Sequence, residues 1–219
     1  LNILAGQAAI AIENARLFQQ SDFMAEMVHE LRTPLAALKT SAVLLNREDL
    51  PEDRRKEIIA TMQGETERLT RLTSEFLDLA RLESGRVRLD MQPFELSKLL
   101  DESIDVVALQ AASRSLAVHQ DYEPFNVMGD RGKIKQVLLN LLTNAINYTP
   151  PTGLITVSVA YREHAGQMWA TFTIKDTGPG ITSADLPHLF QRFYRGEAGR
   201  KSGVQGTGLG LAISDKIVD

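Results

Sequence analysis

Apolar residues recur every three and four positions near the start of the chain, which restricts this part to a helix with one continuous apolar stripe. The residues on the stripe are Met24, Val28, Leu31, Leu35, Leu38, Ala42 and Leu45. This spacing is typical of a coiled-coil seam. A polar turn follows at 46–52, and a second apolar series then runs to about Glu83, interrupted by Glu65. Two helices joined by a short turn predict a helical hairpin.

A single hairpin has too little core to be stable alone. We therefore expect it to dimerise into a four-helix bundle, which buries both stripes. Packing of the hairpin on its own C-terminal domain is the less favoured alternative, because both seams keep coiled-coil spacing. Upstream, residues 3–21 alternate apolar and polar groups in the same register. Two interpretations stay open for that stretch: a parallel dimer seam, or a helix packed against a domain that this chain lacks.

A different pattern begins after Ser84 and Gly85. Alternation at Val87, Leu89 and Met91 predicts a short strand. The other elements expected here are helices over 96–111 and 130–148, and alternating strands over 155–161 and 168–174. Mixed helices and an antiparallel-looking sheet predict a two-layer α/β sandwich. The predicted fold class is α+β, with domains at 1–22, 23–84 and 85–219.

Composition narrows the classes of protein that this chain can belong to. It has 219 residues, a net charge of −4 and no cysteine. We see no basic cluster interleaved with aromatic residues, so no nucleic-acid partner is expected. No apolar run approaches the roughly 20 residues that cross a bilayer, so we expect a cytoplasmic location for this fragment. The chain starts without methionine and stops inside a helical pattern, which indicates a piece of a longer protein.

His29 lies outside the apolar stripe and is expected to face water. Glu30 follows it directly, and Thr33 lies one turn further on the same face. A neutral imidazole is nucleophilic when a neighbouring carboxylate holds or removes the proton on its other nitrogen. Pro34 removes one helical hydrogen bond and is expected to bend the helix here. An idle surface histidine is the ordinary alternative, but this arrangement favours a nucleophile.

The predicted helix over 130–148 carries a polar stripe formed by Gln136, Asn140, Asn144 and Asn147. Asparagine is a poor helix former, so three on one face need a reason beyond solubility. Amide oxygens suit Mg²⁺, which prefers oxygen ligands and keeps water or phosphate in its shell. The stripe therefore predicts a metal and phosphate site.

Two glycine-rich stretches complete a predicted nucleotide pocket. Asp176 precedes Gly178 and Gly180 in a turn, where its carboxylate can accept a hydrogen bond from an exocyclic amine. The stretch 206–211 is expected to open the last helix and to present main-chain N–H groups to phosphate. Between them, the polar segment 196–205 is typical of a mobile lid. An imidazole nucleophile and this pocket together predict phosphoryl transfer from ATP to histidine.

This ordered set resembles the transmitter core of sensor histidine kinases of two-component systems. The matching motifs are His29–Leu35 (H-box), Asn140–Asn147 (N-box), Asp176–Ile181 (G1 box), Leu189–Arg195 (F-box) and Gly206–Leu211 (G2 box). The resemblance covers about Met24 to Asp219, and five motifs in order make it specific. Residues 4–17 further resemble the closing helix of a GAF sensor domain.

The resemblance implies a Bergerat-type ATP-binding domain, whose closing strands after the last helix are absent from this chain. It implies that His29 is the phosphoacceptor, Glu30 its acid/base partner, and Thr33 the residue that orients water for dephosphorylation. The nucleotide-binding positions that it implies are Asn140, Asn144, Asn147, Tyr148, Asp176, Gly178, Gly180, Arg195, Gly206, Thr207, Gly208, Leu209 and Gly210. Asn144 would also be the Mg²⁺ ligand, and Asn147 stands where the family often has a lysine.

The implied partners are ATP with Mg²⁺, the receiver domain of a response regulator, a second copy of the hairpin and an upstream sensor domain. Three alternatives remain: a phosphatase-dominant enzyme, a catalytically silent dimeric signalling module, and an ATPase of the same nucleotide fold without an H-box. The intact motifs disfavour silence, and the two-helix stalk disfavours the last class.

Overall fold

The computed structural model describes residues 2–218 except 86, 165 and 202–205, and it describes side chains from Phe23 onward except, in addition, those of residues 164, 167, 200 and 201. The chain forms two compact units, Leu1–Phe76 and Leu77–Asp219. In the described part of the chain, no helix is both long and apolar enough to cross a membrane.

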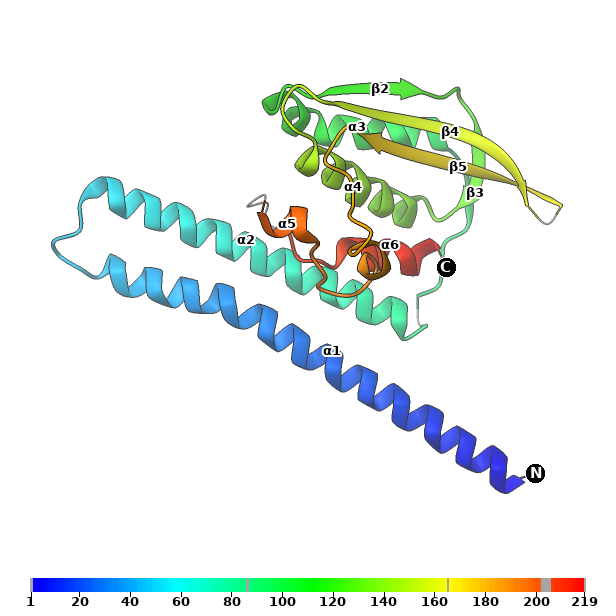
Figure 1. The fold of residues 1–219 in the computed structure, drawn as a ribbon, viewed down its shortest axis with the longest axis horizontal. Helices are drawn as coiled ribbons and strands as arrows, with labels where there is room; N and C mark the ends of the chain where they lie inside the picture. The colour runs from blue at the N-terminus through cyan, green and yellow to red at the C-terminus, as the bar shows by residue number, and fades with distance from the viewer. Residues whose placement is uncertain (1, 86, 165, 202–205, 219) are drawn as a thin grey trace. The chain divides into compact units, whose positions relative to one another are not determined.

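The first unit contains most of the predicted helical hairpin, whose second helix ends at Glu83, within the second unit. Helix α1 (Asn2–Leu45) contains Pro34, and helix α2 (Glu52–Glu83) returns antiparallel to it after the turn (Figure 1). The rings of Phe23 on α1 and Phe76 on α2 stack with centroids 4.5 Å apart. The GAF-like stretch and the alternating positions of residues 3–21 lie outside the described side chains.

The apolar stripe of α1 divides into two halves. Leu31, Leu38 and Leu45, spaced by seven, are partly buried within the single chain. The other half is exposed: Met24, Val28 and Leu35 keep 49%, 52% and 53% of their surface accessible, and Ala42 is exposed as well. One chain therefore covers only half of the stripe, as expected if a second hairpin covers the rest.

The second unit combines two sheets with several helices (Figure 1). Its elements after α2 are β1 (Gln92–Glu95), α3 (Leu96–Ser113), β2 (Ala117–Asp121), β3 (Asn126–Gly129), α4 (Arg131–Tyr148), β4 (Leu154–His164), β5 (Gln167–Asp176), a 3-10 turn η1 (Leu186–His188), α5 (Glu197–Lys201) and α6 (Gly210–Val218). Strands β2, β4 and β5 form one sheet in that order, and β1 pairs with β3.

The sheet differs from the sequence prediction in two respects. Strands β4 and β5 are antiparallel as expected, but β2 runs parallel to β4, so the sheet is mixed. The predicted strand at 87–91 is wrong, because these residues form no strand and pairing starts at Gln92. Apolar alternation is not enough for a strand, which also needs a partner. The partner here is the four-residue strand β3, which pairs with 92–95.

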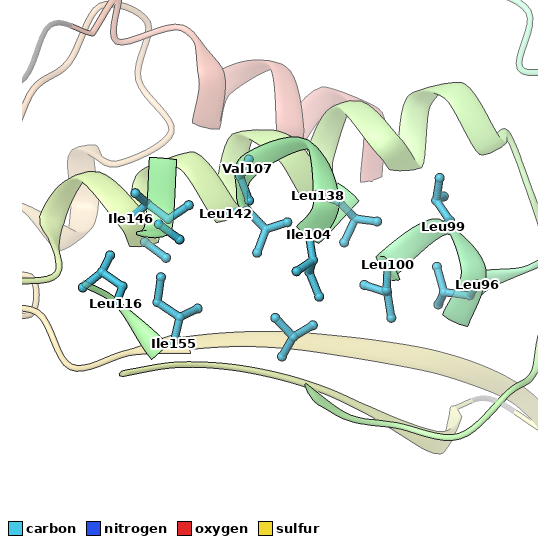
Figure 2. Close-up of a cluster of buried hydrophobic side chains, with 13 residues drawn as sticks. Leu96, Leu99, Leu100, Ile104, Val107, Leu116, Leu138, Leu142, Ile146 and Ile155 are labelled. Atoms are coloured by element: carbon cyan, nitrogen blue, oxygen red, sulfur yellow. The ribbon is translucent and has the colours of Figure 1, made fainter. Parts of the chain in front are cut away.

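The core lies between the helices α3 and α4 and the three-stranded sheet (Figure 2). Leu99 and Leu100 of α3, Leu138 and Ile146 of α4, and Ile155 of β4 are all fully buried. The two-layer sandwich is thus confirmed. Ile146 is buried although it directly precedes Asn147 of the polar stripe, so the apolar face of α4 reaches the edge of that stripe.

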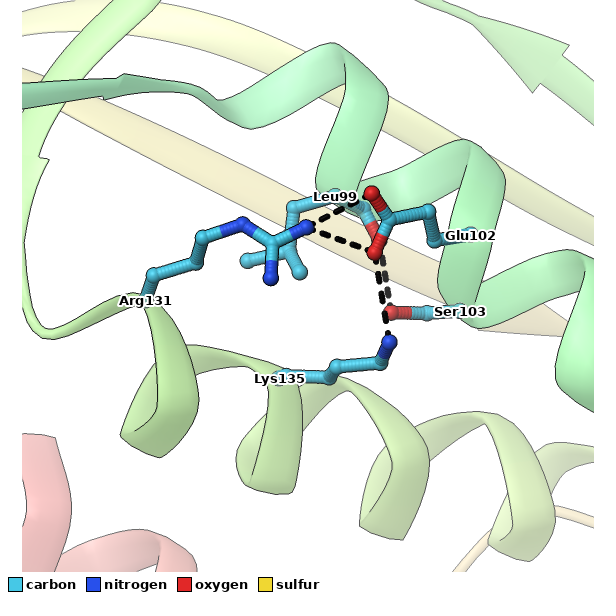
Figure 3. A network of polar contacts seen from close by, with 5 residues as sticks. All are labelled: Leu99, Glu102, Ser103, Arg131 and Lys135. Carbon is cyan, nitrogen blue, oxygen red and sulfur yellow. Dashed lines mark hydrogen bonds and ion pairs between the residues drawn. The ribbon is translucent and has the colours of Figure 1, made fainter.

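Polar contacts fix α3 and α4 to one another at the surface (Figure 3). Arg131 Nη2 lies 2.6 Å from both carboxylate oxygens of Glu102, and Lys135 Nζ lies 3.2 Å from Glu102 Oε2. The hydrogen bond from Arg131 and the one from Lys135 lower the pKa of the Glu102 carboxyl. Asp130 caps α4 by accepting a hydrogen bond from the Lys133 N–H at 3.0 Å.

Candidate functional site

In the hairpin, His29 has the position that the sequence predicted. Its side chain is exposed on α1, Glu30 beside it is partly buried, and Thr33 is exposed one turn further on. An imidazole in this position is accessible to a second reactant, and the adjacent carboxylate is available for proton transfer. The hairpin thus presents an exposed imidazole beside a carboxylate.

A cluster of charges, not predicted from the sequence, lies next to this histidine. Arg68 Nη2 of α2 lies 3.9 Å from Glu30 Oε2, and Arg68 Nη1 lies 3.7 Å from Glu65 Oε2. The side chains of Arg68 and Glu65 are only 17% and 16% exposed. These ion pairs are too long for direct hydrogen bonds. They explain why an acidic residue, Glu65, lies on an apolar seam. Arg68, three positions after Glu65, was the sequence signal from which this pair could have been predicted.

In the second unit, the polar stripe of α4 does not act as one surface. Asn140 Nδ2 donates to Gly210 O at 3.0 Å and to Ser214 Oγ at 3.3 Å, which ties α4 to α6. Asn147 Oδ1 accepts a hydrogen bond from Gln110 Nε2 of α3 at 3.1 Å. Asn144 is partly buried, and no hydrogen bond joins its amide to another described residue. Of the three asparagines, Asn144 therefore has the most available amide.

Tyr148, at the end of α4, brings two other segments together. A Cβ atom at Gly178 would lie 3.1 Å from Tyr148 O and 2.6 Å from Asp176 Oδ1. A Cβ atom at Gly199 of α5 would lie 2.9 Å from Tyr148 Oη. The turn after β5 and the helix α5 thus approach α4 closely at these two glycines.

The turn after β5 is organised by its own aspartate. Asp176 is exposed, and its Oδ1 accepts a hydrogen bond from the Gly178 N–H at 2.7 Å. Gly180 has a positive φ of 73°, which favours glycine, and a Cβ atom there would meet nothing within 4 Å. Asp176 therefore shapes this turn with one carboxylate oxygen, and the space beside Gly180 is open.

The stretch 206–211 opens the last helix, as predicted, because α6 begins at Gly210 within it. Gly208 has φ +74°, and a Cβ atom there would lie 2.6 Å from the Phe193 carbonyl carbon. Thr207 is buried, and its Oγ1 accepts a hydrogen bond from the Leu209 N–H at 3.3 Å. Leu209 is fully buried. The Leu209 side chain therefore anchors the stretch in the interior. Leu209 can contribute to a phosphate site only through its main chain.

The predicted lid is described only in part. Its first residues form the short helix α5, and residues 202–205 lie outside the described residues. Arg195 Nη2 donates to Gly199 O at 2.6 Å, so this arginine supports α5. Taken with the contacts of Asn140, Tyr148 and Gly208, these bonds link the motif segments of the second unit to one another.

Two domain families match this chain. Residues 19–85 match the His Kinase A (phospho-acceptor) domain, and residues 129–219 match the histidine kinase-, DNA gyrase B-, and HSP90-like ATPase family. The second unit thus contains an ATPase-type nucleotide-binding domain, whereas the hairpin contains a phospho-acceptor domain.

Individual proteins are similar over most of this chain. The sensor protein SphS of Synechococcus elongatus is 35% identical over 236 residues, covering 98% of this chain and 54% of SphS. The Acinetobacter baumannii histidine kinase AdeS is similar in structure, with a TM-score of 0.67 and 26% identity, over 87% of this chain and 85% of that chain. The histidine kinase ThkA, solved in complex with the response regulator protein TrrA, has a TM-score of 0.66 and 25% identity, over 83% and 53%. The chain spans about half the length of SphS and less of other curated relatives.

Proposed function

We propose that this chain, which belongs to the sensor histidine kinases of two-component systems, transfers the γ-phosphoryl group of ATP to its own His29. The observation that carries the proposal is an exposed imidazole beside a carboxylate, on the same chain as an ATPase-type domain. The phosphoryl group then passes to an aspartate of a response regulator. The hairpin residue and the nucleotide domain are each needed, because neither supplies both reactants.

In the proposed reaction the unprotonated ring nitrogen of His29 attacks the γ-phosphorus. A nitrogen–phosphorus bond forms, and the bond from the γ-phosphorus to the bridging oxygen breaks. ADP leaves with that electron pair, and Glu30 takes the proton from the other ring nitrogen. Arg68 Nη2 lies 3.9 Å from Glu30 Oε2 and holds this carboxylate beside His29.

The nucleotide would be held by groups that the second unit brings together. We assign the free oxygen of Asp176 to the exocyclic amine of adenine, and the main-chain N–H groups of the stretch 206–210 to the phosphates. Asn144 would hold Mg²⁺ together with phosphate oxygens, which suits an amide oxygen that other described side chains do not engage. Mg²⁺, when bound, neutralises polyphosphate charge. Asn140 acts indirectly in this proposal, by fixing the start of α6.

The hairpin would function as a homodimer that also receives the response regulator. The exposed half of the α1 stripe supports the dimer, and the complex of ThkA with TrrA supports the regulator as partner. Thr33 lies exposed on the same face as His29, where it could hold a water molecule near a docked acyl phosphate. This position favours a second activity, dephosphorylation of the regulator.

The test is incubation of the purified chain with Mg²⁺ and ATP labelled at the γ-phosphate. We expect label that is stable to base and labile to acid, and we expect His29→Gln to abolish it. His119→Gln is the matched control, because His119 is also exposed but lies on β2. Acid-labile label that persists in His29→Gln would overturn the assignment.

Thr33→Ala separates the two activities. We expect autophosphorylation to stay within about twofold of the parent, because exposed substitutions cost little. Dephosphorylation of the phosphorylated regulator should fall by about tenfold or more, since water positioning contributes at least that much to such reactions. An equal fall in both rates would mean that Thr33 acts through the helix and has no role in dephosphorylation.

A further inference from the structure

A buried carboxylate lies beneath the segment that leads into the predicted lid. Asp185 is only 7% exposed. Its Oδ1 accepts a hydrogen bond from Tyr194 Oη at 2.6 Å, and its Oδ2 accepts from Thr182 Oγ1 at 2.9 Å. The Glu197 N–H also donates to Oδ2, at 3.2 Å. A buried carboxylate is costly without such donors, and bonds to its charged form are stronger than neutral ones.

The three donors lie before, within and after the F-box. Thr182 precedes it, Tyr194 lies within it, and Glu197 is the first residue of α5. At Gly196, a Cβ atom would lie 3.0 Å from Asp185 Oδ2, so the chain passes close over the carboxylate. The Asp185 side chain thus joins the beginning of the segment 182–197 to its end.

The end of the segment 182–197, together with α5, contacts the other proposed nucleotide-binding segments. Phe193 has a positive φ of 57° and lies under Gly208. Arg195 donates to Gly199 O, and Gly199 packs against the Tyr148 hydroxyl. A shift of Tyr194 or Glu197 would therefore move both flanks of Arg195 relative to α4 and the stretch 206–210.

We infer that Asp185 is a positioning residue that fixes the lid base, which we define as residues 193–199, for productive binding of the ATP phosphates. The inference rests on the proposed function for the identity of the ligand. Asp185 itself touches no nucleotide in this scheme. Its carboxylate acts by holding the Tyr194 hydroxyl and the Glu197 N–H, which set the position of Arg195 and α5.

The decisive variant is Asp185→Asn, which keeps the size of the side chain. It removes the charge and replaces one acceptor oxygen with an NH₂ group that cannot accept from the Glu197 N–H. We expect affinity for a non-hydrolysable ATP analogue to fall about tenfold, because bonds to a charged acceptor are stronger than bonds to a neutral one. Affinity for adenosine should change less, since the base contact lies elsewhere. Trypsin cleavage at Arg200 or Lys201, just after the lid base, should become several-fold faster.

Asp101→Asn is the matched control. Asp101 also accepts a hydrogen bond from a tyrosine, Tyr122 Oη at 2.8 Å, but on the surface of the same unit and away from the lid base. It should alter neither analogue affinity nor cleavage. Tyr194→Phe deletes one donor alone and should move both readouts in the same direction by less, which keeps the test informative if Asp185→Asn does not fold.

Two results would overturn the inference. One is Asp185→Asn with a lowered melting temperature but unchanged analogue affinity and cleavage, which would make Asp185 a purely structural residue. The other is an equal loss of ATP-analogue and adenosine binding. Neither readout needs phosphorylation of His29. The two proposals can fail separately. If the parent chain takes up no label but Asp185→Asn still increases trypsin cleavage and weakens analogue binding, the kinase proposal is contradicted and this inference is not.

Discussion

In the hairpin, the proposed phosphoacceptor His29 is exposed on a single helix, whereas in the second unit the proposed nucleotide groups are held by bonds within that unit. His29 and Thr33 are both exposed, and only Glu30 approaches a partner, at 3.9 Å. In the second unit, Asn140 is bonded to α6 and Asp176 is bonded within its own turn. In the proposed reaction, the hairpin thus supplies an exposed reactant, and the second unit supplies a site built from mutually bonded segments.

The two units also differ in how they are stabilised. The second unit has its own core, in which leucine and isoleucine side chains are fully buried. The hairpin leaves large apolar residues of α1 about half exposed. Changes in the hairpin should therefore be detected mainly in dimer formation, and changes in the second unit mainly in its folding and in nucleotide binding.

The largest effect is expected from Gly208→Ala. The residue has φ +74°, and the added Cβ would lie 2.6 Å from main-chain atoms of Phe193, which cannot move aside like a side chain. Strain and overpacking of this kind cost about 1–3 kcal/mol each. Affinity for ATP should fall more than about tenfold, since each 1.4 kcal/mol corresponds to a factor of ten. Calorimetric titration with an ATP analogue measures this loss.

Gly64→Ala in α2 is the matched control. A Cβ atom at Gly64 would meet nothing within 4 Å, and replacing an interior helical glycine with alanine stabilises a helix by about 0.5–1 kcal/mol. We expect unchanged nucleotide affinity and a slightly higher melting temperature. Similar losses of affinity in both variants would refute the idea that the glycines of the second unit are constrained by contacts and that Gly64 is not.

The next effect concerns Leu35→Glu on the exposed half of the α1 stripe. A charge placed in an apolar dimer interface has to be desolvated, which disfavours association. The dissociation constant of the dimer should rise by about tenfold or more, corresponding to at least 1.4 kcal/mol. Sedimentation equilibrium measures it directly.

Exposure alone does not predict this effect, and Leu109→Glu shows why. Leu109 of α3 is 87% exposed, more than Leu35, but it belongs to the second unit and to no coiled-coil stripe. We expect no change in the dissociation constant. If Leu109→Glu weakened the dimer as much as Leu35→Glu, the assignment of the interface to the hairpin would fail.

The fold was predictable from the sequence where a local pattern determines it. The hairpin, α3, α4 and the β4–β5 pair followed from apolar periodicity. Strand β2 is mostly exposed and reads AVHQD, without a clear alternation, and β3 has only four residues. Both strands exist because partners pair with them, and a single sequence does not display its partners.

The candidate site likewise has features that a local sequence pattern predicts and features that it does not. The exposure of His29 and Thr33 followed from helical geometry, because both lie off one stripe. The ligand contact of Asn140 stays a prediction, but the bond from its Nδ2 to α6 was not predicted. The carboxylate of Asp185 and the guanidinium of Arg68 were missed, because their donors and partners are distant in sequence or on another helix. Residue types and spacing therefore identified the chemistry, but not the residues that support it.

A smaller effect, on stability alone, is expected from Asp130→Ala. Loss of a helix N-cap costs about 1 kcal/mol, and the second bond, from the Asp90 N–H to Asp130 Oδ2 at 3.0 Å, is lost too. The N–H groups of Lys133 and Asp90 lower the pKa of the Asp130 carboxyl. Its contribution is therefore complete above the ordinary aspartate pKa and disappears as the pH falls through the lowered one. Thermal unfolding at neutral and acidic pH measures this.

Asp130→Asn serves as the control for that experiment, because asparagine caps helices about as well as aspartate does. It should retain most of the stability at neutral pH and should lose the pH dependence. Dimer dissociation should be unchanged in both variants. A higher dissociation constant of the dimer in either variant would mean that a change in the second unit also affects association of the hairpins.

The smallest effect is expected from Glu102→Gln, which removes the carboxylate between Arg131 and Lys135. The ion pair with Arg131 is short, at 2.6 Å, but its side chains are 46% and 44% exposed, so solvent and salt screen it. Because the pKa of Glu102 is lowered, mainly by Arg131, its contribution is present above the ordinary glutamate pKa and is lost as the pH falls through the lowered value. We expect a small drop in the melting temperature at neutral pH and low salt, and none at acidic pH or high salt.

Glu57→Gln makes the same change in the hairpin, where Glu57 pairs with Arg54 at 2.8 Å and the side chains are 63% and 70% exposed. This pair lies within one helix, whereas Glu102 joins α3 to α4, so the hairpin variant should change the melting temperature less. Differential scanning calorimetry across a salt series resolves the two. Equal shifts would show that this ion pair between two helices contributes no more than one within a single helix.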